Sequence, residues 1–171
     1  MARVSIRTLR LRPGEEHRGT VRLVLESLVL GGVAYTVAPA VPAALVVQRA
    51  ATGDVFHLAF STPLEGPCMR CLAPVRVPIE VDAQEYDATD PGVDEELRSE
   101  YVADGELDVE AWARDQVALA IPDQILCRPD CAGLCAVCGK DLNVEPHEHA
   151  ETGVDPRWAA LDALRGDPGD A

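Results

Sequence analysis

The chain has 171 residues, a length typical of one domain or of one domain with an appendage. Its formal net charge of −14 argues against non-specific binding to nucleic acid, which needs a basic surface, and we expect no DNA partner. No stretch approaches the roughly 18 apolar residues of a membrane span. The first residues show no charged segment that leads into an apolar one, so we expect no secretory signal. These features predict a cytoplasmic protein with no membrane partner.

The charges are unevenly distributed. The first 22 residues are rich in arginine, and three of these arginines are candidates for contact with RNA phosphate: Arg7, Arg10 and Arg12. Between Glu80 and Glu110 the acidic residues face a lone Arg98. Three of the acidic residues are candidates for contact with a basic protein: Asp94, Glu95 and Glu96. A solvated strand face and an acidic loop would explain both clusters without any partner.

Apolar residues that recur at every second position predict β-strands over residues 3–11, 20–30, 33–37, 44–48, 55–60 and 75–81. Gly31 and Gly32 mark a turn, and residues 51–54 suit a hairpin connection. Pro78 places the last of these strands at a sheet edge or at a bulge, because proline cannot donate to a β-ladder.

Apolar residues at helical spacing follow Leu107, and Asp108 is a good N-cap for a helix that ends at Pro122. A second helix is predicted over residues 155–164, with Pro156 at its first position. We therefore expect an α+β fold. The predicted parts are a β-rich antiparallel body at residues 1–86, a mobile acidic connection at 87–106, a region of helices and clustered cysteines at 107–165, and a disordered tail at 166–171.

The six cysteines are clustered. Two form Cys68-Met-Arg-Cys71, between two predicted strands, and four crowd into the segment Cys127-Arg-Pro-Asp-Cys131-Ala-Gly-Leu-Cys135-Ala-Val-Cys138-Gly. C-x-x-C spacing lets two thiolates reach one ion, and Gly139 supplies the permissive backbone that such a turn often needs. Two imidazoles follow closely, His147 and His149. In a reducing cytosol, such clusters indicate metal-binding knuckles more than disulfides.

Two divisions of these ligands are open. In the first, Cys127, Cys131, Cys135 and Cys138 surround one zinc ion, which leaves Cys68 and Cys71 without partners. In the second, which we favour, there are two zinc ions. One is held by Cys68, Cys71, Cys127 and Cys131, and the other by Cys135, Cys138, His147 and His149. Four protein ligands per ion are typical of structural zinc and leave no position for catalytic water.

Two enzymatic alternatives use the same residues. A thiol redox protein or sensor could use Cys135 and Cys138, because C-x-x-C is also a redox spacing, although no βαβ pattern surrounds it. A metal-dependent hydrolase could use His147 and His149 with Glu148 as its base, but no open metal position is visible. His17 and His57 stand alone in strand patterns and are expected to be ordinary surface or core residues.

Three stretches together resemble the YceD family of large ribosomal RNA subunit accumulation proteins. They are Cys68-Met-Arg-Cys71-Leu72 with the strand after it, Leu119–Pro122 running into the cysteine cluster as far as Asn143, and the segment from Asp155 to Leu161. The resemblance covers residues 50 to 165, and residues 1 to 50 match only in general β character. Many relatives carry a C-x-C pair where this chain has His147-Glu-His149, a replacement that retains the capacity to bind zinc.

The resemblance implies a cytoplasmic, non-enzymatic protein that supports large-subunit rRNA accumulation and hence ribosome assembly. The implied partner is a precursor of the large ribosomal subunit, contacted through rRNA or through a ribosomal protein. Because the chain is strongly acidic, we favour the ribosomal protein.

Overall fold

The computed structural model describes residues 2–89 and 95–150, and the chain divides into two units, Met1–Cys131 and Ala132–Ala171. Antiparallel strands make up most of the first unit, and helix α2 (Val109–Ala120) packs against them. The expected α+β class with a β-rich body is thus confirmed. The predicted helix at 155–164 and the tail at 166–171 lie outside the described residues.

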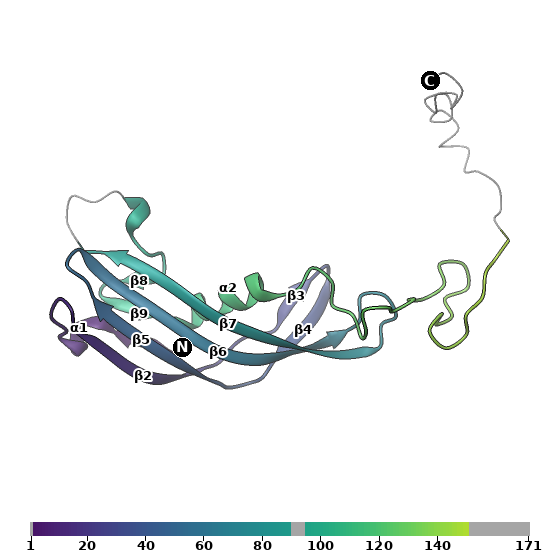
Figure 1. Ribbon diagram of the computed structural model, residues 1–171, viewed down its shortest axis with the longest axis horizontal. Coiled ribbons are helices and arrows are strands. Elements are labelled where there is room, and N and C mark those ends of the chain that lie inside the picture. Colours follow the sequence, from purple (N-terminus) through teal and green to yellow (C-terminus); the bar gives the residue numbers. More distant parts are fainter. Residues whose placement is uncertain (1, 90–94, 151–171) are drawn as a thin grey trace, which may run out of the picture. The chain divides into compact units, whose positions relative to one another are not determined.

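A six-stranded antiparallel sheet forms the body of the first unit (Figure 1). Its central strand, β6 (Gly53–Pro67), pairs along its whole length with β7 (Pro74–Ala88). On its other side β6 pairs first with β5 (Val41–Arg49) and then with β4 (Val33–Val37). The sheet is completed by β2 (Glu16–Leu23) beside β5 and β3 (Leu28–Leu30) beside β4.

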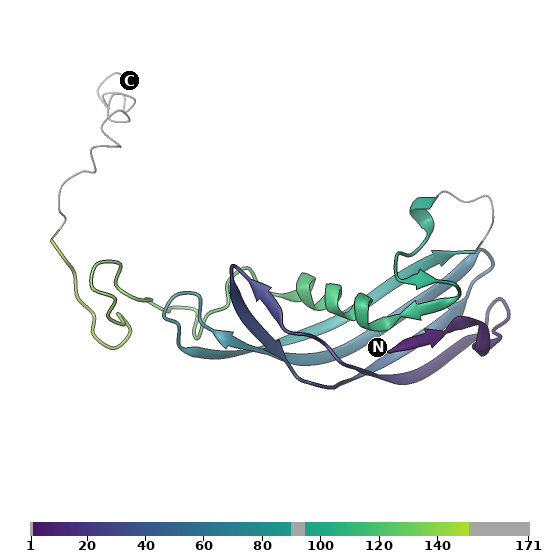
Figure 2. The ribbon, with the colours of Figure 1, turned by 180° about the vertical axis from the view of Figure 1, so that it is seen from behind.

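One face of this sheet is covered and the other faces solvent. Alternate residues of β5 and β6 are buried, because successive side chains of a strand point to opposite faces. Helix α2 lies along the covered face (Figure 2) and buries Val109, Trp112, Ala113 and Val117 there. Its N-cap is Asp108, as predicted, since the Asp108 carboxylate accepts a hydrogen bond from the Ala111 N–H at 3.1 Å.

A three-stranded sheet pairs the N-terminus with the segment just before α2. Its order is β1 (Arg3–Ser5), β9 (Glu106–Asp108) and β8 (Val102–Ala103). An acidic mobile connection was expected at residues 87–106, but β7 extends to Ala88, and a 3-10 turn (Glu95–Leu97), β8 and the start of β9 follow. Contacts distant in sequence explain the difference: the Asp87 carboxylate accepts from the Ser99 N–H, and Tyr101 packs against Trp112.

Two of the predicted strands are shorter than expected. The strand predicted over residues 3–11 ends at Ser5, and helix α1 (Ile6–Leu9) follows, because the Ile6 N–H bonds the Gly105 carbonyl and the Ile6 side chain is buried. The strand predicted over 20–30 is divided into β2 and β3. The pairing of β2 ends at Leu23, and the next N–H, that of Val24, donates to the Glu110 carboxylate at 3.1 Å.

The other strand predictions are confirmed in position, including β4, whose bounds match residues 33–37. Pro78 lies in β7, which pairs only with β6 among the described strands, so the expected edge position is correct. Within the part of the chain that the structure describes, no helix combines the length and the apolar character needed to cross a membrane.

Candidate metal centre

The first C-x-x-C pair lies at the tip of the long hairpin formed by β6 and β7, as the sequence predicted. The hairpin ladder ends at Pro67 and Pro74, and the residues between them turn back tightly. The Cys68 N–H bonds the Ala73 carbonyl at 2.7 Å, and the Leu72 N–H bonds the Cys68 carbonyl at 3.0 Å. This turn presents both thiols of the pair to the segment that follows α2.

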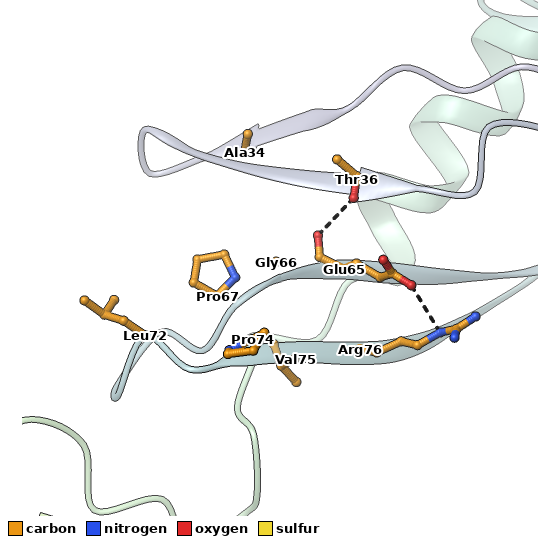
Figure 3. A pocket seen from close by; sticks show the side chains of 9 residues that line it. All are labelled: Ala34, Thr36, Glu65, Gly66, Pro67, Leu72, Pro74, Val75 and Arg76. Atoms are coloured by element: carbon orange, nitrogen blue, oxygen red, sulfur yellow. Dashed lines mark hydrogen bonds and ion pairs between the residues drawn. The ribbon is translucent and has the colours of Figure 1, made fainter. Parts of the chain in front are cut away.

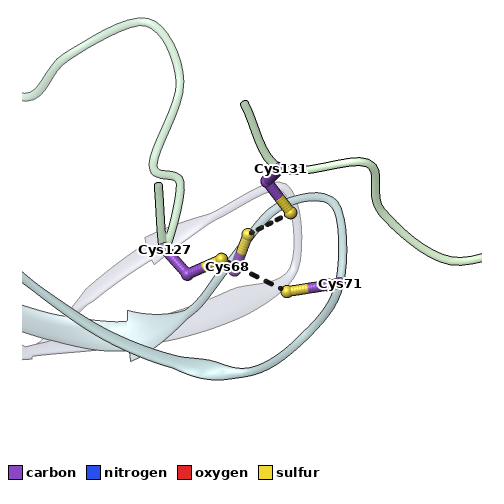
Figure 4. Close-up of side chains that lie close together, drawn as sticks. All are labelled: Cys68, Cys71, Cys127 and Cys131. Carbon is purple, nitrogen blue, oxygen red and sulfur yellow. Dashed lines mark hydrogen bonds between the residues drawn. The ribbon is translucent and has the colours of Figure 1, made fainter. Parts of the chain in front are cut away.

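Four thiols converge at this point (Figure 4). The Sγ atoms of Cys68 and Cys131 are 3.9 Å apart, and those of Cys71 and Cys127 are 3.5 Å apart. All four sulfurs lie within 4.8 Å of one another, and none forms a disulfide. Tetrahedral zinc with bonds of about 2.3 Å would require sulfurs about 3.8 Å apart. The spacing therefore fits one tetrahedral ion.

Contacts that involve no ligand thiol hold this first group together. The Met69 N–H bonds the Ile125 carbonyl at 2.9 Å, and the Ile125 N–H points to the Met69 sulfur at 3.3 Å. The Arg70 guanidinium donates to the Cys131 carbonyl at 2.9 Å. Because Ile125 is buried, the segment from residue 125 to residue 131 is anchored on the hairpin tip on both sides of its two thiols.

The second group lies in the second unit and consists of Cys135, Cys138, His147 and His149, whose ligand atoms also lie within 4.8 Å of one another. The Cys138 sulfur is 3.1 Å from Nε2 of His147. The Nδ1 atom of His147 is 2.7 Å from the Glu145 carbonyl, which can only accept a hydrogen bond. Nδ1 therefore carries the proton, and Nε2 is free to bind a metal.

Asn143 organises the loop of the second group. Its side-chain oxygen accepts from the Ala132 N–H at 2.7 Å, and its amide nitrogen donates to the Asp141 carboxylate at 2.6 Å. The Leu142 N–H bonds the Gly133 carbonyl, so both ends of the Cys135/Cys138 turn are tied together.

Backbone hydrogen bonds favour a thiolate in each C-x-x-C turn. Burial disfavours the Cys68 thiolate, but the N–H groups of Cys71, Arg70 and Cys127 outweigh it and lower the pKa of Cys68 to about 6. The N–H groups of Cys138 and Val137 likewise lower the pKa of Cys135 to about 6. Hydrogen bonding with the Cys71 thiol raises the pKa of Cys127 to about 12. Neighbouring thiolates repel one another, and a divalent cation between them would remove that repulsion.

An open cavity of about 550 Å³ lies beside the first group (Figure 3). Its lining is mostly apolar: Ala34, Gly66, Pro67, Leu72, Pro74 and Val75, with Thr36. The Glu65 carboxylate and the Arg76 guanidinium, 3.4 Å apart, complete the lining. The one carboxylate in this lining, that of Glu65, is thus paired with a guanidinium, and the Thr36 hydroxyl donates to the Glu65 carbonyl.

The predicted ligands form the two groups expected for two ions, and the four cysteines of the one-ion alternative do not form a single group. Cys127 and Cys131 lie with Cys68 and Cys71, whereas Cys135 and Cys138 lie with the two histidines. Glu148, the base of the hydrolase alternative, is exposed and lines an open cavity together with His147. His57 is an ordinary surface residue, as expected, and its Nε2 is 2.5 Å from the Asp82 carboxylate.

The predicted partner-binding residues are placed only in part. Arg7, Arg10 and Arg12 are exposed on α1 and the loop after it. Asp94 and the side chain of Glu95 lie outside the described residues, and Glu96 is exposed in the 3-10 turn.

The residues that position the ligands were missed by the sequence analysis. Arg70 and Met69 are the two residues between the cysteines of the first C-x-x-C, and nothing in their type indicates a role. Asn143 had a clearer signal, because it is the last residue of the motif that gave the resemblance.

Fold and site together define a β-rich protein whose long hairpin and C-terminal segment carry two groups of four thiol and imidazole side chains that can each hold a metal ion. The family described as "Large ribosomal RNA subunit accumulation protein YceD" matches residues 56–165. The chain belongs to this family.

One of the relatives carries the family's name, and two others are uncharacterized proteins. An uncharacterized protein of Mycobacterium tuberculosis is 37% identical over 131 residues, which cover 74% of this chain and 62% of that protein. The protein YlbN of Bacillus subtilis is 32% identical over 64% of each chain. A chloroplastic YCED homolog of Zea mays is 44% identical over 24% of this chain and 14% of its own length. The match thus spans less than two thirds of these relatives' length, and no solved structure matches.

Proposed function

We propose that this protein is a non-enzymatic, zinc-stabilised factor that supports large-subunit rRNA accumulation and ribosome assembly in the cytoplasm. The observation that carries the proposal is the YceD match over residues 56–165, whose printed description names large ribosomal RNA subunit accumulation. The two four-ligand groups fall within the matched residues. A protein that acts by binding, with zinc as a structural element, accounts for both the family match and the two ligand groups.

Structural zinc suits the donor sets. Four thiolates, or two thiolates and two imidazoles, are typical of closed tetrahedral zinc sites. A closed site leaves no position for water or substrate, so neither group is suited to metal-dependent hydrolysis. The first group joins residues that are 56 and 63 positions apart in the sequence. Cross-linking a loop of that length restricts the unfolded chain, an effect worth about 4 kcal/mol on the chain-entropy model.

A basic ribosomal protein is the partner that the charge favours. The chain carries −14 overall, and acidic side chains are frequent between Glu80 and Glu110. Complementary charge accelerates association and selects a partner of opposite sign. The exposed arginines Arg7, Arg10 and Arg12 are the alternative contact, and they would bind rRNA phosphate.

The proposal is tested in cells that lack the gene. We expect mature large-subunit rRNA and large subunits to fall in a sucrose gradient, and the wild-type gene to restore them. The purified protein should comigrate with large-subunit precursors. Normal rRNA levels in the deletion strain, together with no comigration, would overturn the proposal.

Two variants compare the two ligand groups in this test. Cys71→Ser removes a ligand of the first group and should fail to restore rRNA, because it loosens the hairpin body. Cys135→Ser removes a ligand of the second group and should leave the hairpin body folded, so a loss of rRNA with this variant would report a role of the second group itself. Zinc in purified wild-type protein would also exclude the thiol redox alternative, since a metal-bound thiolate is not free to exchange disulfides.

A further inference from the structure

The outer edge of strand β7 carries the further inference. Among the described strands, β7 pairs with β6 alone, so its other edge has no partner strand there. Pro74 and Pro78 lie in the half of β7 next to the hairpin tip, where proline blocks pairing. From Ile79 to Ala88 the strand contains no proline. This second half is a long strand edge that no proline interrupts.

The register shows which backbone groups face outward. The Cys68 N–H bonds the Ala73 carbonyl, so that pair and every second pair along the ladder are the hydrogen-bonded ones. Ile79, Val81 and Ala83 therefore direct their N–H and C=O groups toward β6. The residues between them direct theirs toward the free edge: Glu80, Asp82 and Gln84. All three of these side chains are exposed.

Charge distinguishes this edge from the opposite edge of the sheet. At the β7 edge the outward residues are two carboxylates and one amide, and Glu85 and Asp87 follow. At the opposite edge, β2 presents Glu16, Arg18, Thr20 and Arg22, since Arg49 and Glu15 form a hydrogen-bonded pair there. The β7 edge is thus net acidic and the β2 edge net basic. An extended basic segment fits the first edge and is repelled by the second.

We propose that the β7 edge from Glu80 to Gln84 binds an extended, lysine- or arginine-rich polypeptide segment, which adds to the sheet as a further strand. Backbone hydrogen bonds would supply affinity, and the flanking carboxylates would select basic side chains. The proposal deepens the proposed function, on which it rests, by giving the ribosomal protein partner a docking mode and a place.

The probe is a synthetic peptide of alternating lysine and valine, titrated into the purified zinc-loaded protein by calorimetry. A second peptide of the same sequence has every backbone amide N-methylated, so it keeps its charge but cannot pair with a strand. We expect the first peptide to bind at least 10-fold more tightly than the second. Equal affinity of the two peptides would overturn strand addition.

Two proline variants locate the binding edge. Gln84→Pro removes an outward N–H without touching the β6 ladder and should weaken peptide binding about 10-fold or more. Thr20→Pro makes the matched change at the outward position of β2 and should leave binding unchanged. Two charge-reversal variants test the role of the carboxylates. Glu80→Lys should weaken peptide binding, whereas Glu106→Lys, the same change on β9, should not. Unchanged binding by Gln84→Pro would overturn the proposal.

A measurement on the unmutated protein keeps the test independent of any variant's folding. On addition of the peptide, the exchange of the outward Asp82 and Gln84 amides should slow, while the Val81 and Ala83 amides, already bonded to β6, should change little. The reverse pattern would contradict the proposal. If the peptide adds to the edge but deletion of the gene leaves rRNA normal, only the proposed function fails. If rRNA falls but the peptide does not add, only the docking mode fails.

Discussion

Leu72 in the first C-x-x-C turn occupies the backbone position that Gly139 occupies in the second. Both residues have positive φ, 60° and 73°. In each turn the N–H of this residue bonds the carbonyl of the first cysteine, and the N–H of that cysteine bonds the carbonyl of the next residue along, Ala73 or Lys140. The two turns are therefore built alike, although only one has the glycine that the conformation favours.

This likeness predicts opposite effects at equivalent positions. Leucine in the left-handed region is strained by about 1–2 kcal/mol, and the Leu72 side chain is 62% exposed, so its loss removes little packing. Leu72→Gly should raise the free energy of unfolding of the first unit by up to about 1 kcal/mol, after the added freedom of glycine in the unfolded chain is subtracted.

Gly139→Ala should destabilise the second unit by about 1 kcal/mol, since the new methyl group has open space but the backbone is strained. Denaturant titration of the zinc-loaded protein, followed by amide signals of each unit, measures both changes. Destabilisation by Leu72→Gly would show that the leucine side chain contributes more than its backbone strain costs.

Loss of a ligand should affect the two units differently. Cys71→Ser should destabilise the whole β-rich body, because the first group joins the hairpin tip to the segment after α2. His149→Ala should loosen only the second unit. Hydrogen exchange of the β6 and β7 amides distinguishes the two results. Equal effects of both substitutions, or none from Cys71→Ser, would contradict the two-site division.

Metal release should be biphasic. In the first group only Cys127 is exposed, and Cys68 and Cys131 are fully buried. In the second group Cys138 and His149 are exposed. A chelator such as 4-(2-pyridylazo)resorcinol should therefore remove the second ion faster than the first. The fast phase should be absent in His149→Ala, and the slow phase should be absent in Cys71→Ser.

The stability of the first unit should fall in strong alkali because of Tyr101. Burial, and then the nearby Asp115 carboxylate, raise the pKa of Tyr101 to about 12 from an ordinary value near 10. A raised pKa in the folded state means that the contribution is fully present below about pH 10 and is lost as the pH rises through 12.

Tyr101→Phe removes this titration together with the hydrogen bond to Asp115 at 3.2 Å. Its unfolding free energy should be lower at neutral pH by about 1 kcal/mol and should depend less on pH between 10 and 12. An absorbance titration in which no tyrosine ionises near pH 12, or in which Tyr101→Phe changes nothing, would contradict this assignment.

Salt dependence separates the two partner contacts. If the acidic side meets a basic protein, replacement of Arg7, Arg10 and Arg12 by Ala should leave the affinity for large-subunit precursors and its salt slope unchanged. Neutralising Asp94, Glu95 and Glu96 should slow association instead. If only the arginine variant loses binding, with a flatter salt slope, the contact is to rRNA phosphate.

The sequence predicted those features that depend on local pattern. Alternating apolar residues predicted the strand β7, and Asp108 predicted the start of α2. The C-x-x-C spacing predicted the thiols that gather in the two ligand groups. The failures have non-local causes. Ile6 turns into α1 because Gly105, far along the chain, binds its N–H. Strand β2 ends before Val24, because the Val24 N–H donates to the Glu110 carboxylate, which lies far along the chain. Arg70 fixes Cys131 through a carbonyl, which no residue pattern encodes.

Elemental analysis of the purified protein tests the central claim most directly. The account predicts two zinc ions per chain in the wild type, one in Cys71→Ser and one in His149→Ala. One ion in the wild type that is lost in Cys135→Ser but kept in Cys71→Ser would contradict the two-site division. A wild-type protein without stoichiometric metal would contradict the account as a whole.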